Sequence, residues 1–160
     1  MLDIVFIFGA KYLFLISLAI VSGYFLYVSK EIKRQMIITS VIALPLILII
    51  TQITSHFYYD PRPFVVGNFT PLVPHDPDNG FPSDHTLLTM YVAALVYPHT
   101  KKIAYLLLVL AIMVGLSRVY VGIHHLTDVV GSTVIVLVAI SGAYYLCDQK
   151  LKSISLPWLQ

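Results

Sequence analysis

Uncharged apolar stretches recur along the chain at lengths typical of membrane-spanning helices. Five stretches follow this pattern: residues 12–29, 35–55, 86–98, 103–117 and 129–147. A spanning helix needs about 20 mostly apolar residues, and the third and fourth stretches are too short to cross on uncharged side chains alone. The pattern therefore predicts an all-α fold, an integral membrane bundle of five helices, organised as a single domain over residues 1–160.

The composition supports a membrane protein. Of the 160 residues, 58% are hydrophobic and 11% are charged, whereas soluble domains carry roughly 25% charge. These values exclude a disordered chain and an ordinary cytosolic enzyme. A net charge of +2 also gives no reason to expect a nucleic-acid partner, so membrane lipids are the expected surroundings. Cys147 is the single cysteine, which excludes an internal disulfide.

The basic residues divide between the two sides of the predicted bundle. Seven of them fall on one side: Lys30, Lys33, Arg34, Lys101, Lys102, Lys150 and Lys152. The other three, Lys11, Arg62 and Arg118, fall toward the opposite side. The positive-inside rule therefore predicts a cytoplasmic C-terminus and an N-terminus outside the cell membrane. The first apolar stretch shows no small-residue cleavage pattern after it, so we expect it to remain as an anchor.

Residues 58–82 form the one long predicted loop, and it faces outward. Six of the nine prolines lie in it, and because proline fixes φ and removes a hydrogen-bond donor, we expect no long helix there. Its apolar content indicates a packed lid or wall. Within it we interpret His75 as a solvated residue and Asp76 and Asp78 as turn-forming residues. The run from His75 to Asp78 is only a weak metal candidate, and we expect no metal or other cofactor.

The unusual polar residues converge on the outer end of the bundle. The third and fourth helices have nearly equal lengths, so Arg118 returns to the level of His85. Arg62 follows the outer end of the second helix by a few residues. His124 and Asp128 open the fifth helix four positions apart, which places them on one helix face. The topology therefore predicts a single polar site near the outer membrane surface.

These residue types indicate phosphate chemistry. The guanidinium group of arginine is a charged planar fork that matches phosphate oxygens, and helix N-termini supply further N–H donors. Ser83 is the expected N-cap of the third helix. Without a metal, the arginines must stabilise the developing charge. A site at this depth suits a lipid phosphate or diphosphate, with its head group in water and its tail in the bilayer.

Three short motifs contain the residues of this site. They are Arg62-Pro63, Pro82-Ser83-Asp84-His85, and Ser117-Arg118 with His124 and Asp128 following at fixed spacing. The set resembles the membrane-bound type 2 phosphatidic acid phosphatase superfamily, whose phosphatase site also occurs in vanadium haloperoxidases. The resemblance covers residues 55–128, and the spacing of the third motif is highly specific. Small bacterial members of this kind resemble undecaprenyl-diphosphatases.

The resemblance implies a role for each matching residue. His124 would be the nucleophile that forms a phosphohistidine, and Asp128 would hold its imidazole in the required tautomer. His85 would be the general acid, whereas His125 is interpreted as a neighbour without a catalytic role. The expected substrate-phosphate-binding residues are Arg62, Arg118, Ser83 and Asp84. A nucleophilic histidine must be neutral with one free ring nitrogen, which agrees with a carboxylate four residues away.

Two positions depart from the family pattern. Ser55 stands where the first motif has lysine, and His56 or Lys11 are the residues that could compensate for the lost charge. Asp84 stands where glycine is usual; its carboxylate would repel a phosphate unless it points away or pairs with an arginine. The chain is also one helix short of the family's usual six, and the missing helix would be N-terminal.

The interpretation we adopt is a metal-independent lipid phosphatase that converts undecaprenyl diphosphate to undecaprenyl phosphate at the outer membrane face. Phosphatidic acid, phosphatidylglycerol phosphate and lipid A phosphate are alternative substrates. A non-catalytic, lipid-phosphate-binding membrane subunit is the alternative from a different class, supported by Ser55 and Asp84. A transporter is less favoured because no repeated pair of broken helices is visible.

Overall fold

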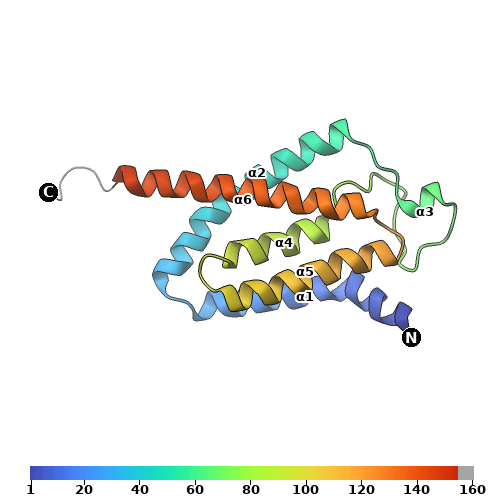
Figure 1. Ribbon diagram of the computed structural model, residues 1–160, viewed down its shortest axis with the longest axis horizontal. Coiled ribbons are helices and arrows are strands. Elements are labelled where there is room, and N and C mark those ends of the chain that lie inside the picture. The colour runs from blue at the N-terminus through green and yellow to red at the C-terminus, as the bar shows by residue number, and fades with distance from the viewer. Residues whose placement is uncertain (155–160) are drawn as a thin grey trace.

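The structure, a computed structural model, describes the backbone of residues 1–154 and the side chains as far as residue 147. Its regular elements are helical, and five of the six are long enough to run along the bundle (Figure 1). They are α1 (Leu2–Tyr27), α2 (Lys30–Phe57), α3 (Pro63–Val66), α4 (Asp84–Val96), α5 (Lys101–Tyr120) and α6 (Leu126–Ile154). This confirms the predicted all-α membrane bundle, with the short α3 added within the loop.

Four helices are long and apolar enough to cross a membrane: α1, α2, α5 and the Leu126–Cys147 part of α6. The α5 helix is longer than its uncharged stretch because Lys101 begins it and Arg118 lies in its last turn. The α4 helix has 13 residues and extends about 20 Å. It is too short to span the hydrocarbon core, as the sequence predicts.

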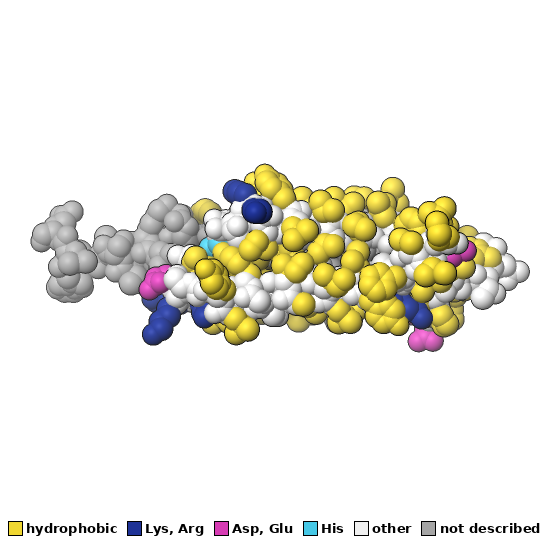
Figure 2. All heavy atoms as spheres, turned by 90° about the horizontal axis from the view of Figure 1, so that it is seen from below, with side chains coloured by type: hydrophobic (Ala, Val, Ile, Leu, Met, Phe, Trp, Pro, Cys, Tyr) yellow, Lys and Arg dark blue, Asp and Glu magenta, His cyan; other side chains and the backbone are white. Residues whose placement is uncertain are grey.

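The α4 helix lies at the centre of the bundle, where it contacts α1, α2, α5 and α6. Its Val96 is fully buried beside Leu107 of α5 and Val136 of α6. The outward faces of the surrounding helices are covered with exposed leucine, isoleucine and valine. Figure 2 shows this apolar surface across the middle of the molecule, with charged side chains toward its two ends. The protein is therefore a multi-pass membrane protein.

The loop between α2 and α4 is packed against one end of the bundle. Leu72 N donates to Val121 O at 3.0 Å, and Val73 packs in a buried cluster with Ala10, Val121 and Ile123. The loop closes on itself where Gly80 N donates to the carbonyl of Asp60 at 2.8 Å. It is therefore a wall of the polar end, which agrees with the expectation of a packed loop.

Candidate active site

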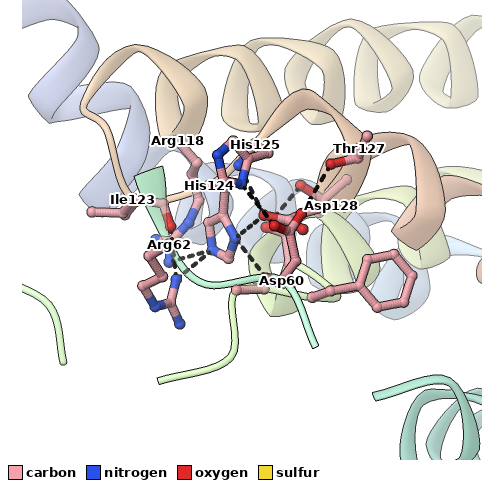
Figure 3. A network of polar contacts seen from close by, with 12 residues as sticks. Asp60, Arg62, Arg118, Ile123, His124, His125, Thr127 and Asp128 are labelled. Atoms are coloured by element: carbon pink, nitrogen blue, oxygen red, sulfur yellow. Dashed lines mark hydrogen bonds and ion pairs between the residues drawn. The ribbon is translucent and has the colours of Figure 1, made fainter. Parts of the chain in front are cut away.

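His124 lies at the centre of the polar site, in the turn between α5 and α6. The side chain is 2% exposed. Its Nε2 lies 3.3 Å from Arg62 Nη1 and 3.4 Å from Arg118 Nη2, and its Nδ1 lies 3.2 Å from Asp128 Oδ2. Figure 3 shows the two arginines on one side of the ring and Asp128 on the other. Residues separated by up to 66 positions in the chain therefore meet here, as the motifs predict.

The contact between His124 and Asp128 has a different origin from the one expected. Because α6 begins at Leu126, His124 precedes the helix and the two residues do not share a helix face. Asp128 instead reaches back and accepts a hydrogen bond from His125 N at 2.8 Å, in the manner of a capping box. The carboxylate that begins the helix is thus the one that contacts the imidazole.

The surroundings of the imidazole define its tautomer. Nδ1 of His124 faces the carbonyl of Gly80 at 2.9 Å as well as the carboxylate of Asp128. Both are acceptors, so Nδ1 carries the hydrogen and Nε2 keeps a lone pair. Burial lowers the pKa of His124 and the charges of Arg62 and Arg118 lower it further, whereas the hydrogen bond to Asp128 opposes them. A neutral imidazole with a free Nε2 can act as a nucleophile.

Two buried guanidinium groups face this nitrogen. Arg62, which precedes α3, is 5% exposed and donates from Nη1 to the carbonyl of Ile123 at 2.8 Å. Arg118, in the last turn of α5, is also 5% exposed and donates from Nη1 to the carbonyl of Ala10 at 3.2 Å. These hydrogen bonds to main-chain carbonyls hold the two guanidinium groups in place. Two adjacent buried cations form a site suited to an anion such as phosphate.

Ser83 connects the start of α4 to α6. Its N–H donates to Ser132 Oγ at 2.8 Å, and the Ser132 hydroxyl is 3.1 Å from the carbonyl of Ser83. Ser83 occupies the N-cap position of α4, but its side chain makes no capping hydrogen bond. The hydroxyl accepts instead from Thr86 Oγ1 at 3.1 Å. The capping prediction is therefore wrong for the side chain, because a neighbouring hydroxyl competes for it.

His85 and Asp84 lie in the first turn of α4, near the same site. The partly buried ring of His85 packs edge-on against Phe14, with 4.7 Å between ring centroids. It lies near enough to Arg118 and His124 for a positive charge on either residue to disfavour its protonated form. The side chain of Asp84 is exposed and makes no hydrogen bond or ion pair within the described part of the chain. The carboxylate therefore has no fixed contact with the arginines.

The loop contributes two residues that the sequence interpretation missed. The centroid of the His75 ring lies 6.3 Å from that of His124, and Asp78 Oδ1 accepts from Arg62 Nε at 2.6 Å. We expected a solvated histidine and a turn-forming aspartate. The available signal was that both lie in a loop flanked at each end by site residues, Arg62 and Ser83.

Neither residue proposed to replace the missing lysine contacts the arginines or His124 in the described residues. His56 is exposed and packs against Phe57, and Lys11 is exposed on α1. Ser55 itself donates to the carbonyl of Gln52 at 3.3 Å. Neither residue therefore supplies a positive charge in contact with Arg62, Arg118 or His124.

One group of side chains beside the site has the spacing of metal ligands. Potential ligand atoms of Asp60, His125 and Asp128 lie within 4.8 Å of one another. His125 Nδ1 is already 3.2 Å from Asp60 Oδ1, and Asp60 Oδ2 accepts from Thr127 at 3.2 Å. These contacts give the group a structural role in holding the loop against α6.

Comparison with known proteins identifies the family. The model of the PAP2 superfamily matches residues 34–152. The chain is 29% identical to undecaprenyl-diphosphatase BcrC of Bacillus subtilis over 86% of this chain and 70% of that protein. It is 36% identical to the bacitracin transport permease protein BcrC of Bacillus licheniformis over 81% of this chain, which is 64% of the relative's length.

A solved structure shows the same fold. The crystal structure of Aquifex aeolicus LpxE aligns with a TM-score of 0.72, covering 90% of this chain and 86% of that one, at 21% sequence identity. The helical fold thus agrees with the family match. The chain belongs to the PAP2 superfamily of membrane phosphatases.

Proposed function

We propose that the protein hydrolyses a lipid diphosphate or monophosphate through a phosphohistidine on His124, and that undecaprenyl diphosphate is its substrate. The observation that carries this proposal is the position of the unprotonated Nε2 of His124, which faces both Arg62 and Arg118, with Asp128 on the opposite nitrogen. The choice of lipid is supported by the relative from Bacillus subtilis, which is named an undecaprenyl-diphosphatase.

The reaction has two steps. In the first, Nε2 of His124 attacks the terminal phosphorus, a nitrogen–phosphorus bond forms, and the bond from phosphorus to the bridging oxygen breaks. The leaving lipid phosphate departs with the electron pair and can receive a proton from His85. Arg62 and Arg118 stabilise the negative charge on the phosphoryl oxygens, while Asp128 stabilises the positive charge that the imidazole acquires.

In the second step, water attacks the phosphohistidine. His85, which lost its proton in the first step, accepts one from the water as the oxygen–phosphorus bond forms. The nitrogen–phosphorus bond then breaks, and its electron pair returns to Nε2 of His124. Inorganic phosphate leaves, and the enzyme is restored. Two buried guanidinium groups supply the charge stabilisation, so no metal is required in this proposal.

The charge distribution supports the proposed orientation in the membrane. The site end contains Arg62 and Arg118, whereas Lys30, Lys101 and Lys102 lie at the helix ends away from it. By the positive-inside rule, the site faces outward, with the N-terminus outside and the C-terminus in the cytoplasm. A lipid head group would then reach His124 from the outer leaflet.

The test is phosphate release from undecaprenyl diphosphate by purified protein in detergent, with and without EDTA. We expect activity in both conditions, its loss in His124→Ala and its retention in His56→Ala, a matched control on an exposed histidine. Activity that persists in His124→Ala would overturn the mechanism. If the wild-type protein binds orthovanadate but releases no phosphate from any lipid, the alternative of a non-catalytic lipid-phosphate-binding subunit is correct.

A further inference from the structure

The loop between α2 and α4 places His75 beside His124. Its ring lies at 75° to that of His124, with 6.3 Å between the centroids. The side chain is only partly buried, and its Nδ1 lies 3.4 Å from the carbonyl of Asp76. Nε2 makes no hydrogen bond within the described part of the chain. A phosphoryl group attacked by His124 would lie within reach of this nitrogen.

The protonation state of His75 depends on the charges around it. Burial lowers the pKa of His75, and the nearby positive charges of Arg62 and Arg118 lower it further, whereas Asp78 opposes them. Without a bound anion, the neutral form of His75 is therefore favoured over a third positive charge beside Arg62 and Arg118. A phosphate dianion bound between the arginines would reverse this balance, because an adjacent negative charge favours the protonated form of histidine.

The site lacks a positive charge that its family pattern predicts. Ser55 replaces the lysine of the first motif, and neither His56 nor Lys11 contacts the arginines or His124. His75 is a titratable side chain that lies beside His124 and comes from a different part of the chain. Its loop is held against the bundle by the hydrogen bond from Leu72 N to the carbonyl of Val121.

We propose that His75 is a substrate-binding residue that donates a hydrogen bond, as an imidazolium, to the phosphoryl group between His124 and the two arginines. It thereby supplies the third cation of the site in place of the missing lysine. The inference rests on the proposed lipid phosphatase function. Its ligand class is a tetrahedral or trigonal-bipyramidal oxyanion, for which inorganic phosphate and orthovanadate are the simplest probes.

The experiment compares three variants of the full chain: His75→Gln, His75→Lys and His56→Gln. Orthovanadate binding is measured by calorimetry, and kcat/KM is measured on a lipid diphosphate. We expect His75→Gln to lose about 10- to 100-fold in both, the range of a hydrogen bond to a charged group. His75→Lys restores the charge and should recover most of the loss. His56→Gln should match the wild-type protein.

The results separate this inference from the function on which it rests. Equal orthovanadate affinity and equal kcat/KM in His75→Gln and wild-type protein would overturn it. Equal losses in His75→Gln and His75→Lys would also overturn it, because charge would not be the property that matters. If no lipid diphosphate is hydrolysed but His75→Gln still weakens orthovanadate binding relative to His75→Lys, the substrate proposal fails and the role of His75 in anion binding stands.

Discussion

Asp78 holds Arg62 through a hydrogen bond of 2.6 Å between Oδ1 and Nε, although 16 residues separate them. The side chain of Arg62 is 6% exposed, whereas that of Asp78 is 62% exposed. The carboxylate therefore contacts Nε of the guanidinium and leaves Nη1 to contact Ile123 and His124. The loop between α2 and α4 thus positions one of the two arginines that face His124.

We expect Asp78→Asn to lower kcat/KM about 10-fold. The amide keeps the shape of the carboxylate but removes its charge, so the charge-assisted bond to Arg62 weakens by about half. Repulsion between Asp78 and substrate would favour the opposite result, but the exposed carboxylate is screened by solvent. Steady-state kinetics on a lipid diphosphate measure the effect, with the neighbouring Asp76→Asn as a matched control. Equal values for both variants would show that Asp78 does not position Arg62.

Asp128→Asn should separate catalysis from stability. The amide oxygen can still accept from His125 N, so the start of α6 should lose less than about 1 kcal/mol. The carbonyl of Gly80 still faces Nδ1 of His124, but the amide lacks the negative charge that stabilises the positive imidazole formed during attack, so kcat should fall about 10²- to 10⁴-fold. Thermal unfolding in detergent and phosphate release measure the two effects. A large loss of stability with little loss of kcat in the remaining folded protein would contradict the assignment.

The helical part of the fold could be predicted from the sequence because its signal is local. The five apolar stretches correspond to α1, α2, α4, α5 and α6. The α5 helix extends beyond its stretch at both ends because charged residues such as Lys101 and Arg118 continue the backbone hydrogen bonding, whereas α1 and α4 each end two residues before their stretches do. An apolar stretch marks the part of a helix in lipid, and the helix itself can be longer.

The site could be predicted only where the motifs define it. His124, Asp128, Arg62 and Arg118 meet as expected. The roles of loop residues such as Asp78 could not be predicted, because a proline-rich segment has no period that projects its side chains onto a face. Contacts between distant backbone groups, such as Gly80 with Asp60, decide where such a loop lies.

As the pH is lowered, kcat/KM should begin to fall only below the ordinary histidine pKa of 6.5. Burial and the two arginines lower the pKa of His124. The neutral, nucleophilic form therefore persists as the pH falls past 6.5 and is lost only at lower pH. The measurement is the pH profile of kcat/KM, corrected for ionisation of the substrate phosphate by titrating it separately. An acid limb above 6.5 that remains after this correction would contradict the prediction.

His85→Ala should harm monoester turnover more than diphosphate turnover. A lipid monoester expels a poor alkoxide that needs a proton, whereas a diphosphate expels a stabilised phosphate. The loss of a general acid typically costs about 10²- to 10⁴-fold, and we expect the monoester to show the larger part of that range. Phosphate release from phosphatidic acid and from a polyprenyl diphosphate provides the comparison. Equal losses on both substrates would argue against His85 as the acid.

The orientation of the bundle can be tested with two cysteines. Thr70 is exposed in the loop at the site end, and Lys102 is exposed at the start of α5. Thr70 is preferable to Asn68, whose φ of 48° would strain a cysteine. In a Cys147→Ser background, we expect an impermeant thiol reagent to label Thr70→Cys in intact cells and to leave Lys102→Cys unlabelled.

Permeabilised cells are the control for this experiment, because both cysteines should react once the membrane is no longer a barrier. The expected pattern follows from the excess of Lys and Arg at the end away from the site. Labelling of Lys102→Cys alone in intact cells would place His124 on the cytoplasmic side. A substrate head group would then have to come from the inner leaflet, and the proposed site on the outer face would be wrong even if the chemistry at His124 were correct.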